Sequence, residues 1–211
     1  MINNLKYVVE TSTISNYVYR TPLIQVNGDG EVEPKYRTND KGILIKKVSL
    51  LYVVGYDNNG VLHSFDPIEE ANQFILAHHL DEDKLESAQL SKGLAHFFEF
   101  VIAKQRVWDE EYDEDTFDEL YDLPRPRWDW FPKRKAERIT YQYRNGLKDL
   151  VLKHGSLAKT TATGYMSAVI NFYKYWLRKG YRFNNPPFEH EVIQIHFEAS
   201  ASSMKSYMRK D

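Results

Sequence analysis

The stretch from Lys159 to Arg182 constrains the fold most strongly, because its pattern is typical of a helix with two different faces. Large apolar residues recur at intervals of three and four, which is the spacing of a helix face buried in a core. These residues are Tyr165, Met166, Val169, Ile170, Phe172, Tyr173, Trp176 and Leu177. We therefore predict a long helix that begins near Thr160 or Thr161 and ends before Gly180.

The other face of this predicted helix carries no acidic and no large apolar side chain. Its members are Thr160, Thr163, Ser167, Asn171, Lys174 and Arg178. Small hydroxyls, an amide and cations are groups that reach base edges and phosphates in the major groove of DNA. The solvated face of an ordinary amphipathic helix has a similar composition, so this pattern alone leaves both interpretations open.

The stretch from Lys133 to His154 shows the same division into two faces. Its apolar stripe consists of Ile139, Tyr143, Leu147, Leu150 and Val151. Its polar stripe consists of Arg134, Arg138, Tyr141, Asn145 and Lys148, with Arg144 beside it. Only residues 155–158 separate the two predicted helices, so their polar faces can form one continuous surface for a duplex. This conjunction is the main argument from the residues for DNA binding.

The distribution of charge supports this interpretation better than the total charge does. The 211 residues carry a formal net charge of −2, but residues 108–122 contain nine acids and no bases, and residues 131–182 contain twelve Lys or Arg against two acids. The local excess of positive charge is what a polyanion would meet. The chain has no cysteine, which excludes disulfides and thiolate catalysis and suits a reducing cytoplasm. The stretch at residues 1–10 lacks the basic and apolar regions typical of a signal peptide, and no apolar run approaches the roughly 20 residues that span a membrane.

Residues 1–66 are predicted to form a small β-rich unit of three to five antiparallel strands. Apolar and aromatic stretches at 7–11, 16–20, 22–26, 43–56 and 61–65 alternate with Asn-, Asp- and Gly-rich turns. Scattered basic residues in this unit are interpreted as a solvated sheet face. Asp66 and Pro67 are typical of a helix start, and the adjacent His78 and His79 would point about 100° apart on that helix, which disfavours a shared metal ion.

Residues 67–187 are predicted to form a mainly helical unit with an acidic insertion at 108–132. A helix is expected over 85–107. The insertion lacks the glycine that a calcium-binding EF-hand loop needs, so we interpret it as an exposed segment that contacts another protein or a basic surface. Residues 188–211 are interpreted as a linker, with a strand or extended stretch at 191–197.

The helix at 159–182 and the residues after it resemble the last long helix of the core-binding domain of tyrosine recombinases, the phage-type integrases. The resemblance spans roughly residues 90–187. It is carried by Thr161, Tyr165, Met166, Phe172, Tyr173, Trp176, Gly180, Asn185 and Pro186. It implies a helical domain whose last helix lies against the DNA of the crossover site, followed by a separate catalytic domain.

The chemistry that the family performs is missing from this chain. The resemblance implies a tyrosine nucleophile activated by arginines and a His-x-x-Arg box. No His-x-x-Arg occurs here, and the surroundings of Tyr207 do not match the family's nucleophile. Motifs of nucleotide-binding enzymes and serine hydrolases are missing as well. We expect a non-catalytic part of a longer or truncated recombinase that needs no cofactor or metal and takes no small-molecule substrate.

The sequence therefore predicts an α+β protein that binds double-stranded DNA at a recombination site, together with other protomers of the recombinase. The expected phosphate contacts are Lys133, Arg134, Arg138, Arg144, Lys148, Lys159, Lys174, Arg178 and Lys179. The expected contacts to base edges are Thr160, Thr161, Thr163, Ser167 and Asn171. The alternative is a protein-interaction or regulatory module that binds its partner through the acidic, aromatic segment 108–132.

Overall fold

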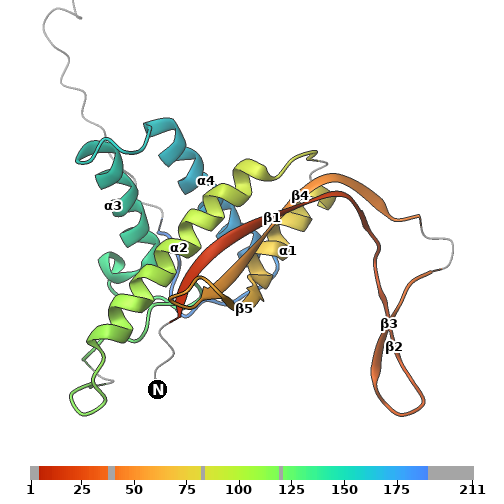
Figure 1. Cartoon of the computed structure of the whole chain (residues 1–211), viewed down its shortest axis with the longest axis horizontal. Helices are drawn as coiled ribbons and strands as arrows, with labels where there is room; N and C mark the ends of the chain where they lie inside the picture. Colours follow the sequence, from red (N-terminus) through yellow and green to blue (C-terminus); the bar gives the residue numbers. More distant parts are fainter. Residues whose placement is uncertain (1–4, 38–40, 82–83, 119–120, 190–211) are drawn as a thin grey trace, which may run out of the picture.

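The structure of the chain, a computed structural model, describes residues 5–37, 41–81, 84–118 and 121–189 (Figure 1). The stretch predicted to be extended at 191–197 and Tyr207 lie outside these ranges. The fold is α+β, as predicted: an N-terminal antiparallel sheet is followed by the helices. Two long strands run side by side through the middle of the molecule, and the helices lie against them.

The sheet consists of β1 (Lys6–Tyr19), β4 (Ile43–Tyr56) and β5 (Leu62–Pro67), with β4 in the centre. β1 and β4 pair over their whole lengths. The stretches predicted as separate strands at 7–11 and 16–20 therefore form one strand, with Asn16 at a φ of 54° inside it. The β4–β5 turn has the expected Asn-Gly sequence, and the Asp57 carboxylate accepts hydrogen bonds from the backbone N–H of Asn59 and Val61 at 2.8 Å each.

Between β1 and β4 the chain leaves this sheet and forms a separate two-stranded ribbon that projects from the body (Figure 1). Its strands are β2 (Leu23–Val26) and β3 (Val32–Lys35), which pair in antiparallel fashion. β3 is a strand that the sequence analysis missed, because its Glu33 and Pro34 have low strand propensity. The ribbon has only two strands, so Pro34 can occupy a position that demands no hydrogen bond from its nitrogen.

In the part of the chain that the structure describes, four α-helices follow: α1 (Glu69–Asp81), α2 (Ala88–Glu111), α3 (Ile139–Leu152) and α4 (Lys159–Arg178). The predicted start of α1 at Asp66 is wrong, because Asp66 and Pro67 still pair with β4. α2 continues to Glu111, into the acidic segment. The predicted helix at 133–154 is interrupted: residues Lys135–Glu137 form a short 3₁₀ helix, and α3 begins only after Arg138.

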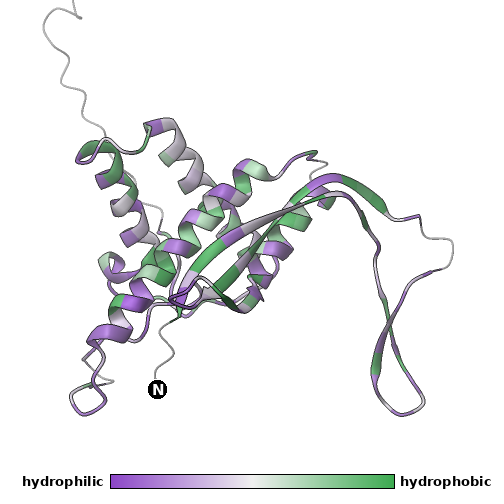
Figure 2. Cartoon of the chain, viewed as in Figure 1, coloured by the Kyte–Doolittle hydropathy of each residue, from purple (hydrophilic) through white to green (hydrophobic). Residues whose placement is uncertain are grey.

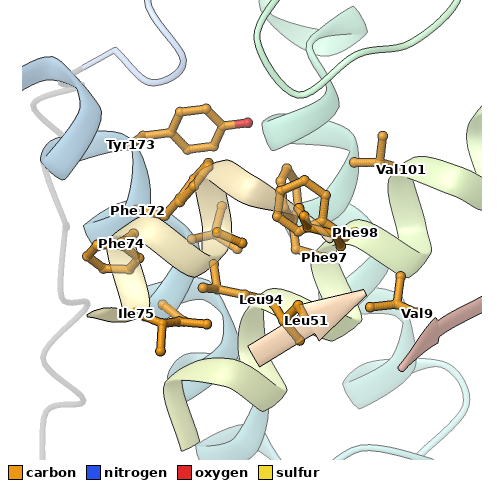
Figure 3. Packing of buried hydrophobic residues seen from close by; sticks show 14 of the residues in the cluster. Val9, Leu51, Phe74, Ile75, Leu94, Phe97, Phe98, Val101, Phe172 and Tyr173 are labelled. Atoms are coloured by element: carbon orange, nitrogen blue, oxygen red, sulfur yellow. The ribbon is translucent and has the colours of Figure 1, made fainter. Parts of the chain in front are cut away.

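The sheet and the helices share one buried cluster (Figure 3). Leu51 from β4, Ile75 from α1, Phe97 from α2 and Phe172 from α4 all belong to this cluster, and each is fully buried. The division predicted at residue 66 falls inside β5 and cuts across this common core. Of the predicted apolar stripe of α4, Val169, Phe172 and Tyr173 are buried, and Leu177 is half exposed. The remaining members are partly buried, namely Tyr165, Met166, Ile170 and Trp176. Tyr175, which the stripe did not include, is buried.

Two features fix where α4 lies. Gly93 of α2 faces it, and a Cβ at this position would stand 2.7 Å from the Cβ of Ala168, so the two helices cross closely. After α4 the chain returns to the segment before α3. There the side-chain amide of Asn184 accepts a hydrogen bond from the backbone N–H of Phe131 at 2.9 Å and donates one to its carbonyl at 2.8 Å. No helix in the described ranges is long and apolar enough to cross a membrane.

Candidate nucleic-acid interface

The polar stripe of α4 faces solvent along its whole length. Thr160, Thr163, Ser167, Asn171, Lys174 and Arg178 are all exposed. The opposite side of the helix is buried against α2 and α1. With a rise of about 1.5 Å per residue, the stripe is roughly 27 Å long, which is close to the ~34 Å of one turn of B-DNA. In Figure 2, hydrophilic and hydrophobic residues alternate along the visible turns of α2.

The first half of this stripe meets α3 at a shallow groove. Arg144 and Lys148 from α3 and Lys159 and Thr163 from α4 line it, and Leu147, Val151, Leu152, Ala162 and Met166 complete its lining. The Thr163 hydroxyl donates a hydrogen bond to the Lys159 carbonyl at 2.9 Å, which leaves its oxygen lone pairs to accept. Residues from two helices therefore form one cationic and hydroxyl-bearing surface, which we call the α3–α4 groove.

The second half of the stripe borders α1 and α2 instead. Asn171, Lys174 and Arg178 line a second groove with Phe74 and His78 of α1 and Leu90 of α2. Lys179 continues this basic surface, and its ammonium lies 5.5 Å from the centre of the Tyr175 ring. Asp81 lines a neighbouring hollow together with Arg178 and Lys179. This end of α4 is therefore less uniformly positive than the α3–α4 groove.

The cations of both grooves are available for an external anion. Within the described residues, no carboxylate forms an ion pair with Arg144, Lys148, Lys159, Lys174 or Arg178. Elsewhere such pairs are common, for example Arg125 with Asp109 at 2.7 Å and Arg127 with Asp129 at 2.7 Å. Exposed cations that lack a partner carboxylate can bind a phosphate without first giving up an ion pair.

Arg138 is a correction to the predicted phosphate contacts, because its side chain is only 4 % exposed. Its guanidinium donates hydrogen bonds to the carbonyls of Pro132, Lys133 and Pro186 at 3.0, 2.8 and 2.9 Å, and to the Glu189 carboxylate at 2.8 Å. These four hydrogen bonds turn the guanidinium toward the interior of the protein and away from any external phosphate. Arg138 therefore joins the start of α3 to the segment after α4. It lies at the position where the predicted helix is interrupted, between the 3₁₀ helix and α3.

Lys133 and Arg134 are exposed, but they lie before the start of α3 and not at the α3–α4 groove. They line a different and larger hollow together with Phe117, Tyr121, Leu123 and Trp130. Arg134 also forms an ion pair with Glu137 at 3.3 Å. Thr161 is partly buried. The predicted DNA contacts thus fall into two groups, because Lys133 and Arg134 lie before the start of α3 and line a different hollow from the rest.

The acidic segment after α2 folds back on the end of that helix. The Trp108 ring stacks on Tyr112 with centroids 4.5 Å apart, and its indole N–H donates to the Leu123 carbonyl at 2.9 Å. Arg125 makes two hydrogen bonds to Asp109, at 2.7 and 2.9 Å, and this contact lowers the pKa of the Asp109 carboxyl. The segment is therefore packed through its aromatic residues, and most of its acids point to solvent.

No group of three or more His, Asp or Glu side chains in the described ranges is arranged to hold a metal ion. The rings of His78 and His79 have centroids 6.2 Å apart at an angle of 69°. Nδ1 of His79 lies 2.5 Å from the Lys84 carbonyl oxygen, so this nitrogen is the donor of a hydrogen bond that closes the end of α1.

The chain was also compared with models of protein families, with curated proteins and with solved structures, and none of the three comparisons found a match.

Proposed function

We propose that the chain binds duplex DNA through the polar faces of α3 and α4, without cleaving it. The observation that carries this proposal is the α3–α4 groove. There Arg144, Lys148 and Lys159 converge from two helices with no carboxylate paired to them in the described part of the chain. A solvated helix face needs no such convergence, whereas a phosphate backbone requires several cations at once.

The exposed stripe of α4 supports a role for this helix in reading the duplex. Thr163, Ser167 and Asn171 follow the cations along the same face. Hydroxyl and amide groups can both donate and accept hydrogen bonds, as contacts to base edges require. Together with the sequence resemblance, this supports the proposal that the chain is the DNA-gripping part of a site-specific tyrosine recombinase. It would act in the cytoplasm beside other protomers in DNA integration and recombination.

The test is a titration of the full chain against labelled fragments of its own genome, measured by anisotropy at several salt concentrations. Neutralising about six phosphates would make log K fall with log salt at a slope of about −5. A subset of fragments that stays bound at high salt would identify a specific site. The absence of binding at low salt would overturn the proposal, and a steep slope without a selected subset would limit it to non-specific binding.

Two double variants locate the interface. Lys148→Ala with Lys159→Ala removes cations from the α3–α4 groove, and Lys174→Ala with Arg178→Ala removes them from the other half of α4. Each lost phosphate contact reduces the salt slope by about 1. The matched control is Lys46→Ala with Lys47→Ala, which removes the same charge from exposed positions on β4. An equal loss in the control would show that net charge, and not this surface, determines binding.

A further inference from the structure

The ribbon formed by β2 and β3 has one face that is apolar and uncovered. Ile24 pairs with Pro34, and Val26 pairs with Val32, so these four side chains share one face of the ribbon. Ile24, Val26 and Val32 are 74 %, 67 % and 66 % exposed. The other face carries Leu23, Gln25, Glu33 and Lys35. A ribbon this amphipathic, standing away from the core, has the composition of a contact surface.

Charges along the ribbon are ordered from its tip to its base. Asp29, Glu31 and Glu33 lie at or beside the tip, and Arg20, Lys35 and Arg37 lie toward the base. Asn27 shapes the tip: its side-chain oxygen accepts hydrogen bonds from the backbone N–H of Asp29 at 3.0 Å and of Glu31 at 2.8 Å. The acids are thus held at the end that would enter a partner first, which disfavours a phosphate backbone as that partner.

The hollow beside the acidic segment has the complementary properties, and we call it the aromatic groove. It has a volume of about 780 Å³, and Phe117, Tyr121, Leu123 and Trp130 supply its apolar surface. Lys133 and Arg134 stand on its lining together with Glu137, which pairs with Arg134 at 3.3 Å, and Asp122 lies beside Tyr121. Beyond Asp122 lie the exposed acids of the segment that follows α2. The apolar surface of the aromatic groove is therefore bordered by both cations and acids.

We propose that the ribbon of one copy of this chain docks in the aromatic groove of a second copy. The apolar face around Ile24 and Val26 would cover Tyr121, Leu123 and Trp130. The acidic tip would meet Lys133 and Arg134, and the basic base of the ribbon would meet the acids after α2. The ribbon thus offers an apolar face and charges of both signs, and the aromatic groove offers the complementary apolar surface and charges of both signs.

The contact must join two molecules. In Figure 1 the ribbon lies at one end of the long axis of the molecule, and the segment after α2 lies toward the opposite end. A ribbon therefore cannot reach the groove of its own chain. A contact between two different surfaces closes only if it is reciprocal or forms a ring, and otherwise it produces chains of molecules.

The experiment is sedimentation velocity of the full chain without DNA, so its result is independent of the proposed function. Wild-type protein is expected to associate between roughly 1 and 100 μM, the range of modest apolar interfaces. Ile24→Ser with Val26→Ser removes the ribbon's apolar face, and Tyr121→Ser with Leu123→Ser removes that of the groove. Each double variant is expected to weaken association by about tenfold or more, from the loss of buried apolar area.

Mixing the two double variants provides the decisive result. The ribbon variant retains an intact groove and the groove variant retains an intact ribbon, so the mixture is expected to form a one-to-one complex and to associate more strongly than either variant alone. Failure of the mixture to associate would overturn the proposal, as would a wild-type monomer at every concentration. Persistent association of the groove variant would also overturn it, because ribbons would then be pairing with each other.

A matched control removes exposed leucines elsewhere. Leu152→Ser with Leu177→Ser changes side chains that are 70 % and 50 % exposed, on α3 and α4. This variant is expected to associate like wild type, and an equal loss of association would overturn the assignment to ribbon and groove. Circular dichroism with thermal unfolding checks that every variant is folded, and all substituted positions lie outside the buried cluster.

Discussion

Arg138 was predicted to contact phosphate, but its side chain is buried and binds groups inside the protein. Its guanidinium donates hydrogen bonds to the carbonyls of Pro132, Lys133 and Pro186 and to the Glu189 carboxylate. The carboxylate is partly exposed, and the neighbouring cations lower the pKa of the Glu189 carboxyl below its usual value. Arg138 therefore stabilises the junction that holds α3 in position beside α4, and its contribution to DNA binding is indirect.

We predict that Arg138→Met destabilises the protein by about 3–5 kcal/mol, because three carbonyls and a carboxylate lose a buried charged donor. The measurement is chemical unfolding followed by fluorescence. Arg134→Met is the control: its side chain is 84 % exposed, and its loss should change stability by less than about 0.5 kcal/mol. Similar values for the two variants would contradict the structural role of Arg138.

His96 of α2 lies between two tyrosines, Tyr143 of α3 and Tyr165 of α4. Its ring centroid is 4.9 Å from that of Tyr165, and Nδ1 lies 3.1 Å from the Tyr143 hydroxyl oxygen. Removal from water disfavours the charged imidazolium, so the pKa of His96 is lowered from its ordinary value of 6.5. In the unfolded chain His96 would bind a proton at a higher pH than in the folded protein.

We therefore predict that the free energy of unfolding falls as the pH drops below about 6.5 toward the lowered pKa of His96, because the unfolded state takes up the proton first. Above this range the contribution of His96 to stability is complete. Unfolding of the wild type and of His96→Gln is measured from pH 7.5 to 5.5, a range set by the ordinary pKa. Parallel pH profiles for the two proteins would exclude His96 as the source.

At the scale of the elements, the crossing of α2 and α4 positions the polar stripe. Gly93 allows the close approach, since a Cβ there would lie 2.7 Å from Ala168 Cβ and 3.2 Å from Tyr165 Cα. Gly164 lies in α4 as well, but a Cβ there would meet only the Gln89 amide nitrogen at 3.7 Å. The two glycines are therefore different: one is required by packing and the other is not.

We predict that Gly93→Ala destabilises the protein by about 1–3 kcal/mol through overpacking, despite the better helix propensity of alanine. Gly164→Ala should instead be neutral or stabilising by up to about 1 kcal/mol. Thermal unfolding of both variants tests this difference. A stabilised Gly93→Ala protein would mean that α2 and α4 are farther apart than the structure places them.

At the scale of the whole molecule, the ribbon is an appendage to a body that is complete without it. Tyr19 pairs with Ile43 at the point where the chain leaves the sheet, so β1 and β4 can be joined directly. Ile24, Val26 and Val32 contribute nothing to the buried cluster. The body, with the sheet and four helices, is expected to fold when the ribbon is removed.

We predict that replacing residues 20–42 by an Asn-Gly turn preserves cooperative unfolding and shifts stability by no more than about 1 kcal/mol. The salt slope of DNA binding should also stay the same, because the α3–α4 groove is intact. Thermal unfolding and anisotropy measure the two properties. Loss of cooperative folding would show that the ribbon is part of the body, and a reduced salt slope would place the ribbon at the DNA.

Much of the candidate site follows from the sequence by itself, because helix periodicity is local. The spacing of Val169, Phe172 and Tyr173 determines which side of α4 is buried, and the exposed stripe from Thr160 to Arg178 is the necessary complement. The glycine after each basic helix ends it in a left-handed conformation, with φ of 61° at Gly155 and 85° at Gly180. The α+β class and the Asn-Gly hairpin are local features in the same sense.

Only the tertiary structure decided which cations belong together. Arg138 falls on the polar stripe of the helix predicted at 133–154. Its partners Pro186 and Glu189 lie 48 and 51 residues away along the chain, so a local sequence pattern cannot predict these contacts. Lys133 and Arg134 are separated from the α3–α4 groove by the position where the helix breaks. The uncovered face of the ribbon depends on the register of β2 with β3, which is set by pairing between strands and not by the propensity of either strand.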